Sequence, residues 1–436
     1  MNWIQQYQIR NYLRSSLWPM PLAAAVAAVL FHRLIWEFDL WTRWELLGFT
    51  PDGARAVVGA ITASGLTFII FLLGMLFIAV QIAAGQLTPR ITARVFEARA
   101  SKISLGFFIF TYVFSIGVGG RLVEPIPQFA VLLAVVFTLV SIGLFLFLVG
   151  FTGKGLRPIS VYAKVADETI RVVEGLYPAL LTESKGALAD EPFFPSAKPS
   201  ARIHHRGRSG VFRAFDAEGL AEAARKYDCV IQLVPQVGDF VVKGDPLFYI
   251  YPNGGIVPER ELQQSVAFGP DHKLEQNPAF GFRIIVDIAI RALSPAVNDP
   301  TTAVRGVDQI HNLLRMIGER NLGDGLVRDK EGHPRLVFPT PDWEDFIWLG
   351  VSEIRTYGAG SLQVLRRLRG MLENLIEALP PERIPPLQEQ VSLLERAAER
   401  NLPDPEERKL AGIGDYQGIG GSRLRHTRRP GAQNII

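Results

Sequence analysis

Reactive and metal-binding side chains are scarce in this chain of 436 residues. It holds a single cysteine, Cys229, and seven histidines. One cysteine excludes an intrachain disulfide and any zinc site built from several cysteines. The sequence also lacks a phosphate-binding P-loop, an H-E-x-x-H pair and a G-x-S-x-G elbow. We therefore expect no metal site, no cofactor and no catalytic residues, and an enzyme is the least favoured class.

Net charge is also small. The chain carries 46 basic and 43 acidic residues, which gives a formal net charge of +3. Such a balance provides no strong overall field to attract an anionic polymer. We therefore expect no nucleic-acid partner.

Charge is absent altogether from Val57–Ala84, a run of 28 residues. A helix needs roughly 20 apolar residues to cross a hydrocarbon core about 30 Å thick. This run therefore predicts a membrane-spanning helix, and three further apolar runs predict three more. The four predicted spans, within a transmembrane domain of residues 1–156, are residues 17–35, 57–84, 103–122 and 128–151.

Basic residues near the ends of these spans are distributed unequally. Nine lie on the side that holds the N-terminus, and four lie on the opposite side. Because basic flanks favour the cytoplasm, both termini are predicted to be cytoplasmic. Between the first two spans, residues 36–47 are rich in tryptophan, which favours the membrane interface. This segment is either a short helix on the outer surface or a loop packed on the ends of the spans.

Small and polar residues recur along one face of the second span. This face has two interpretations: a close contact between helices, which is favoured for the face alone, or the lining of a pore. In the second interpretation Phe71 and Ile78 would form apolar constrictions. The absence of ionisable residues in the span argues against a proton-coupled pump. The candidate pore-lining residues are Ser64, Thr67, Phe71, Gly74, Ile78 and Gln81.

The chain after the spans predicts a cytoplasmic α+β region, starting with a module at residues 157–260. Within it, residues 238–247 read G-D-F-V-V-K-G-D-P-L. This pattern resembles the turns and strands of small lipoyl-type β-barrels, in which glycine permits tight turns. No lysine stands in a hairpin suited to modification. We therefore expect a structural or assembly module rather than a carrier.

A helical module is predicted at residues 261–411, followed by a disordered tail at 412–436. Arg366, Arg367 and Arg369 form a basic patch on one of its helices. The patch is either a solvated helix face or a contact for lipid headgroups. The predicted helices are residues 280–293, 301–316, 343–379 and 386–411.

Between the first two of these helices lies the densest group of polar residues in the sequence. Asp299 followed by Pro300 is typical of a helix start, with an N-cap and a proline in the first turn. The segment is therefore either a well-capped helix–turn–helix or a site for a ligand or ion. The residues of the candidate turn site are Arg291, Ser294, Asn298, Asp299 and Thr302.

Several motifs together resemble a bacterial family of predicted membrane proteins, domain of unknown function 2254. The resemblance covers roughly residues 5 to 400, with Pro19 and Leu87-Thr88 as departures from the pattern. It implies residence in the bacterial inner membrane and a two-part architecture, and it implies no catalytic residues. The motifs are Ser16-Leu17-Trp18, Gly85-Gln86-Leu87-Thr88-Pro89-Arg90, the run Val237–Leu247 and, most specific, the run Ala292–Ala303.

The expected fold class is an α-helical membrane protein with four transmembrane helices and a cytoplasmic α+β region, made of a small β-barrel-like module and a helical module. Four spans are few for a monomeric transporter, so a pore would form between copies of the chain. We therefore expect an oligomeric channel-like or conduit protein whose cytoplasmic part assembles or gates it. Its partners would be the lipid bilayer and other copies of the chain. The alternative is a non-conducting sensor or scaffold that binds a cytoplasmic ligand or protein partner.

Overall fold

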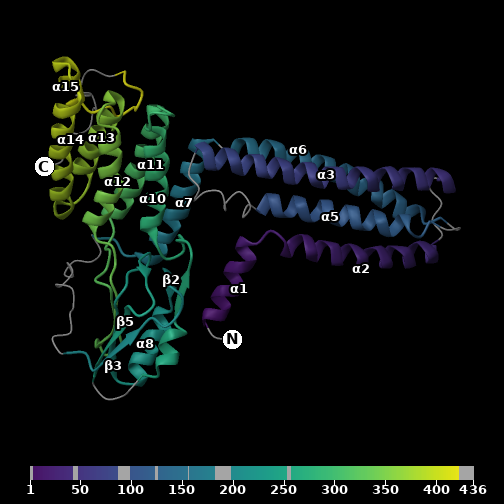
Figure 1. Cartoon of the computed structure of the whole chain (residues 1–436), viewed down its shortest axis with the longest axis horizontal. Coiled ribbons are helices and arrows are strands. Elements are labelled where there is room, and N and C mark those ends of the chain that lie inside the picture. Colours follow the sequence, from purple (N-terminus) through teal and green to yellow (C-terminus); the bar gives the residue numbers. More distant parts are fainter. Residues whose placement is uncertain are drawn as a thin grey trace. The chain divides into compact units, whose positions relative to one another are not determined.

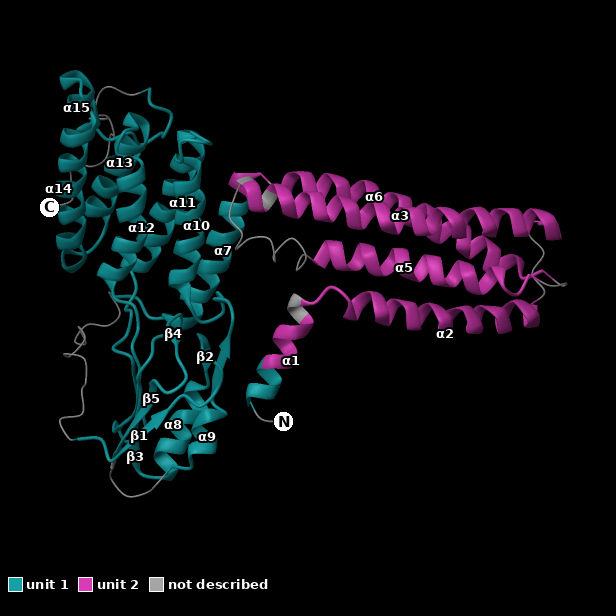
Figure 2. Cartoon of the chain, in the orientation of Figure 1, with its two compact units in different colours: residues 1–7, 161–436 teal, residues 8–160 magenta. Residues whose placement is uncertain are grey.

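The computed structural model describes residues 3–42, 48–86, 99–122, 126–155, 157–181, 198–252 and 257–421. The chain divides into two compact units, shown in different colours in Figure 2. Residues 8–160 form one, here called the membrane unit. Residues 1–7 and 161–436 form the other, here called the α/β unit. Helix α1, Trp3–Ser15, begins in the second and continues into the first.

Four helices of the membrane unit are long and apolar enough to cross a bilayer (Figure 1), which confirms that each of the four predicted spans is a long apolar helix. Helix α5 contacts the other three. The first span is longer than predicted, because its helix continues through Trp36 to Thr42. At least the first part of the tryptophan-rich segment is therefore a continuation of that span, and residues 43–47 lie outside the described residues. The helices are α2 (Pro19–Thr42), α3 (Pro51–Gln86), α5 (Arg99–Gly119) and α6 (Gln128–Gly155).

Aromatic packing forms the centre of the membrane unit. Phe114 of α5 is fully buried, and its ring centroid lies 5.9 Å from that of Phe31 on α2 and 5.3 Å from that of Phe137 on α6. Rings at these separations attract one another, and close van der Waals packing is a main source of helix association in lipid. The core of this unit therefore joins α2, α5 and α6.

The α/β unit contains two sheets. The larger has strand order β1-β5-β3-β8-β7, and the smaller has order β4-β2-β6. Neither closes on itself within the described chain, so the expected barrel-like module is not confirmed. The reason is that β3 pairs in parallel with β8, a strand from beyond residue 330, which extends the larger sheet as an open one. The strands are β1 (Ala201–His204), β2 (Gly210–Phe215), β3 (Cys229–Leu233), β4 (Phe240–Val241), β5 (Pro246–Pro252), β6 (Val266–Gly269), β7 (Leu326–Arg328) and β8 (Pro334–Val337).

Helices make up the rest of this unit. Two of the predicted helices are each interrupted: residues 343–379 form α12 and α13, with a break at Gly358–Ser361, and residues 386–411 form α14 and α15, with a break at Leu402–Asp404. Residues 412–421, expected to be disordered, instead pack on α13 around the buried Asp415. The helices are α7 (Pro158–Leu176), α8 (Ala217–Lys226), α9 (Glu259–Gln263), α10 (Pro278–Ala292), α11 (Pro300–Gly318), α12 (Trp343–Tyr357), α13 (Leu362–Ala378), the short 3-10 helix η1 (Pro381–Arg383), α14 (Ile384–Asn401) and α15 (Pro405–Ala411).

Helix α7 runs antiparallel to α10 and parallel to α11. Three contacts along its length establish this direction: Thr169 packs on Gly281, Tyr162 packs on Gly306, and the Arg320 guanidinium donates to the Tyr177 carbonyl at 2.8 Å. The turn between α10 and α11 therefore lies at the N-terminal end of α7. The sheets lie beyond its other end, where Tyr177 and Phe215 line one cavity.

Candidate functional site

The polar face of α3 is exposed in the single chain. Phe71 is 61% exposed and Ile78 is 58% exposed, and the other four candidate pore-lining residues, Ser64, Thr67, Gly74 and Gln81, are exposed as well. Helix α3 packs on its neighbours through a different face, which includes Val58 and Leu72. The neighbouring helices cover this face only in part: the Phe71 ring contacts Phe145 of α6, with ring centroids 5.7 Å apart, and Ser64 lies beside a small cavity that Thr111 of α5 and Ser141 of α6 also line. The exposed remainder of the face is surrounded by lipid, water or another copy of the chain.

Two hydroxyls on this face bond to their own helix. Ser64 Oγ donates to the Ile61 carbonyl at 3.1 Å, and Thr67 Oγ1 donates to the Ala63 carbonyl at 3.4 Å. At 1.5 Å per residue, Gln81 lies about 39 Å along the helix from Arg55. This separation exceeds the thickness of a hydrocarbon core, about 30 Å, so the middle of the core falls about halfway between these two residues. Thr67 and Phe71 are therefore the members of this face nearest the middle of the bilayer.

The turn between α10 and α11 brings the other candidate residues together. Asp299 is the N-cap of α11: its carboxylate accepts from the Thr302 amide at 3.0 Å and from the Thr302 hydroxyl at 2.6 Å. Ser294 Oγ donates to the Arg291 carbonyl at 2.7 Å, which closes the end of α10. Asn298 is exposed and has a left-handed φ of 47°. Four of the five residues thus have structural roles in the turn, and the Arg291 guanidinium has no ion pair with a described residue.

We predict that Asp299→Ala lowers the free energy of unfolding by about 1 kcal/mol, the usual effect of losing an N-cap. Asp299→Asn is the matched control, because an asparagine side chain caps as well as an aspartate. Urea unfolding of the purified protein in detergent would measure both changes. A loss in the Asn variant equal to that of the Ala variant would mean that the charge at this position matters and not the cap.

The predicted basic patch on α13 is not a surface for lipid or solvent. Arg366 is 3% exposed and Arg367 is 5% exposed. Arg366 donates to the carbonyls of the 413–420 segment, while Arg367 donates to Asp308 at 2.7 Å and to His311 Nδ1 at 3.1 Å. Both proposed interpretations of the patch were therefore wrong for these two residues. The reason is that α11 and the C-terminal segment pack over the face that carries them.

His311 lies inside this network as a neutral ring. Its Nδ1 accepts from Arg367, so its Nε2–H donates to Asn374 Oδ1 at 2.9 Å. Burial, with a further contribution from the positive charge of Arg367, lowers the pKa of His311 below its ordinary value of 6.5. Protonation would place a second donor against the guanidinium. The fold therefore favours the uncharged ring.

This arrangement predicts that acid destabilises the α/β unit. As the pH falls below 6.5, His311 takes up a proton in the unfolded chain before it does so in the folded chain. The stability that the neutral ring contributes is therefore fully present above pH 6.5 and falls as the pH is lowered. The slope contributed by His311 reaches at most about 1.4 kcal/mol per pH unit. We expect His311→Gln to flatten the pH dependence of urea unfolding between pH 7 and 5. His204→Gln, at an exposed histidine of β1, serves as the control.

A cavity of about 380 Å³ opens where α7 ends and α10 begins. Its walls are mostly apolar and include Phe215, Leu322 and Phe338. Burial raises the pKa of Tyr177, which also lines it, to about 12. The Gln276 amide at its edge is engaged with the backbone of Phe215. This volume and lining suit a small, largely apolar molecule, and no metal cluster lies among the described residues.

Two ionisable residues of the first span were missed by the sequence analysis. Asp39 of α2 is buried, and its carboxylate accepts from the backbone amides of Phe129 and Ala130, at 3.3 and 2.9 Å, at the start of α6. His32, two turns earlier on the same face, is buried against Gly117 and Phe114. A histidine and an aspartate seven residues apart in an apolar helix were the available signal, because such residues face the bundle interior.

Four long apolar helices and an α/β unit outside them define a polytopic membrane protein of two parts. The family model described as "Predicted membrane protein (DUF2254)" matches residues 14–374, and the chain belongs to this family. The resemblance drawn from the sequence motifs is thereby confirmed.

Curated relatives cover nearly the whole chain. An uncharacterised protein of Mycobacterium tuberculosis (strain H37Rv) and one of Mycobacterium bovis are each 28% identical to it over 421 residues, which is 92% of this chain and 80% of each relative. No solved structure matches the chain.

Proposed function

We propose that this protein is a homo-oligomeric conduit of the bacterial inner membrane, with both termini in the cytoplasm. The exposed polar face of α3 would lie where copies of the chain meet, and the α/β unit would assemble or gate the oligomer. The observation that carries the proposal is the position of that face. Small and polar residues gather on a side of α3 that remains largely exposed beside the chain's own described helices. Small residues allow helix backbones to approach closely, which lipid chains do not require.

Crosslinking tests the contact between copies. In a Cys229→Ala background, Thr67→Cys should form a disulfide-linked dimer in oxidised membranes. Leu139→Cys is the control, because Leu139 is 63% exposed on α6, outside the proposed contact. A strictly monomeric mass in detergent, with no dimer from Thr67→Cys, would contradict the proposal.

Ion flux from liposomes tests conduction. Phe71 lies near the bilayer centre and would narrow the path, so Phe71→Ala should raise the flux. Gln81→Leu replaces a polar amide near the end of the path, so it should lower or alter the flux. Unchanged flux in both variants would remove α3 from the path. An oligomer without any flux would favour the second candidate.

The second candidate is a non-conducting sensor or scaffold, and the cavity beside Tyr177 supports it. A small apolar ligand bound there would stabilise the α/β unit and raise its unfolding temperature. Leu322→Trp should fill the cavity and abolish that shift. A thermal-shift screen of small molecules against both proteins would identify a specific ligand. Neither candidate assigns a catalytic role to any residue.

A further inference from the structure

Helices α12 and α14 of the α/β unit pack side by side and run in the same direction. Where both begin, the Trp343 indole N–H donates to the Arg383 carbonyl at 2.9 Å. Further along, the positive charges of Arg396 and Arg400 on α14 lie within electrostatic range of Arg355 on α12. At 1.5 Å per residue, Arg355 lies about 18 Å along α12 from the first of these contacts. Arg396 lies about 20 Å along α14 from the same contact, so the two arginines are level.

Arg355 is a buried cation without a partner in the described chain. The residue is 8% exposed, and its Nε is buried with no hydrogen-bond partner. No carboxylate of the described residues forms an ion pair with its guanidinium. Burial, together with the positive charges of Arg396 and Arg400, lowers the pKa of Arg355. Because a buried charge is unfavourable unless it is paired, this guanidinium is suited to bind an anion from outside the chain.

Arg396 and Arg400 complete a group of three guanidiniums. Both residues are exposed, and Arg400 Nε donates to the Arg396 carbonyl at 3.1 Å. The acidic residues next to them are occupied elsewhere: Glu395 accepts from Arg369 at 2.7 Å, and Glu399 lines a hollow between α13 and α15. An anion at the three arginines therefore meets no competing carboxylate from these neighbours.

We propose that Arg355, Arg396 and Arg400 form a binding site for a phosphate group. A guanidinium presents its N–H donors in a planar fork that binds two oxygens of one phosphate. A phosphate monoester carries up to two negative charges, so it balances three guanidiniums better than a singly charged carboxylate does. Bound there, it would pair the buried charge of Arg355 and link α12 to α14. The group belongs either to a soluble molecule or to a lipid headgroup.

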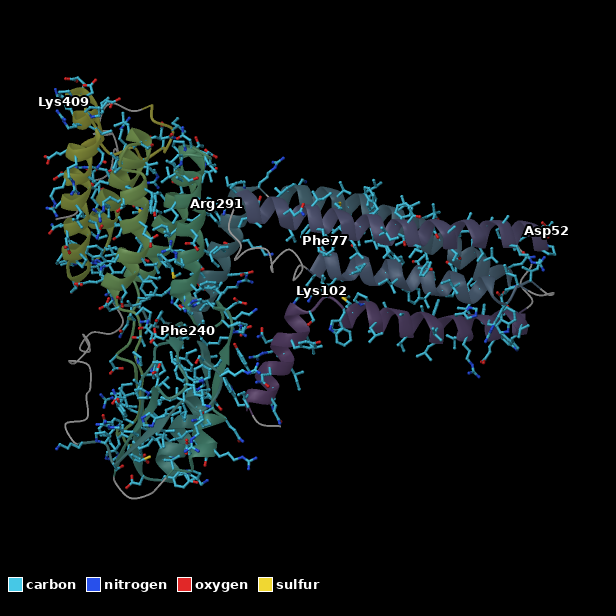
Figure 3. All side chains as sticks on the ribbon, in the orientation of Figure 1. Asp52, Phe77, Lys102, Phe240, Arg291 and Lys409 are labelled. Carbon is cyan, nitrogen blue, oxygen red and sulfur yellow. The ribbon has the colours of Figure 1, made fainter. Side chains whose placement is uncertain are left out.

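The proposed phosphate site does not depend on the proposed conduit. It lies among the helices of the α/β unit, where Figure 3 labels Lys409 of α15. The cavity beside Tyr177 is lined by residues of other elements, and neither α12 nor α14 contributes to it. The site therefore requires no ligand in that cavity, no oligomer and no conduction.

Thermal unfolding of the full-length protein in detergent tests the site with two probes, inorganic pyrophosphate and dioctanoyl phosphatidic acid. At least one should raise the unfolding temperature in a saturable way, because a ligand that binds only the folded state stabilises it. Tighter binding of pyrophosphate would indicate a soluble source, and tighter binding of phosphatidic acid a lipid headgroup. Dioctanoylglycerol, which lacks the phosphate, should have no such effect.

Arg355→Met separates a binding role from a structural one. The change removes an unpaired buried charge, so it should raise the unfolding temperature in the absence of a probe. It should also weaken binding of the probe by about tenfold or more, since a charge-assisted hydrogen bond is lost. A structural role would instead predict a lower unfolding temperature and an unchanged response to the probe, and that result would overturn the proposal.

Arg225→Met is the matched control, because it removes one exposed positive charge from α8, which packs on the larger sheet. It should bind both probes as the unchanged protein does. Arg396→Gln combined with Arg400→Gln alters only exposed positions, so it should fold and should also weaken binding; it decides the matter if Arg355→Met does not fold. A protein that responds to neither probe, or equal weakening in Arg225→Met and Arg355→Met, would contradict the site.

Discussion

Gly281→Ala is expected to lower the free energy of unfolding of the α/β unit by about 3 kcal/mol, the upper range for overpacking a core. A methyl group at this position of α10 would lie 2.9 Å from both Cβ and Cγ2 of Thr169 on α7, and closer still to its hydroxyl. Thr169 cannot turn away easily, because it is fully buried and its hydroxyl donates to the Val165 carbonyl at 2.7 Å. Alanine gains about 1 kcal/mol over glycine in a helix, which is too little to offset the clash.

Two further variants isolate the cause. Gly175→Ala makes the same change at an exposed glycine of α7 with open space around it, so no loss is expected there. Thr169→Ala combined with Gly281→Ala should recover more than half of the stability that Gly281→Ala loses. Urea unfolding in detergent, followed by tryptophan fluorescence, would measure all three. Equal losses in the single and double variants would show that the contact between these helices is not the cause.

Arg367→Met is expected to lower the free energy of unfolding by about 3 kcal/mol, as when one partner of a buried ion pair is removed. The substitution leaves the Asp308 carboxylate and the His311 ring without the donor that now binds both. It should also weaken the acid sensitivity assigned to His311, because the guanidinium contributes to the lowered pKa of that ring.

Arg305 provides the matched control, since it binds the same Asp308 carboxylate at 3.3 Å but is half exposed. Exposed pairs contribute roughly 0.2–1 kcal/mol, so Arg305→Met should have a small effect. Replacing both members of the buried pair, with Arg367→Met and Asp308→Leu, should recover part of the loss. Equal losses of unfolding free energy in Arg367→Met and Arg305→Met would show that burial does not determine how much each arginine contributes to stability.

Local patterns in the sequence predicted the elements well where local forces determine them. The apolar runs indicated all four long apolar helices, and Asp299 was identified as an N-cap, as its bond to Thr302 confirms. Each of these features depends on residues within a few turns of one another.

Long-range packing was where prediction failed. The sequence around Gly238–Leu247 suited a small barrel, but β3 finds a partner in β8 that no nearby pattern indicated. Arg366 and Arg367 suggested a charged surface, because nothing local shows that α11 and the 413–420 segment cover them. The exposed face of α3 was visible as a stripe, yet its exposure depends on where the other helices pack.

The parallel pairing of β3 with β8 also determines the order in which the chain can fold. Ile231 pairs with Leu336, which is made 105 residues later. Until then β3 has β5 on one side and an open edge on the other, and open edges invite pairing with other chains. A nascent chain that stops before residue 334 therefore has its membrane helices complete but its main sheet unprotected. Because domains fold as units during synthesis, chaperone binding to this protein should be greatest in that interval.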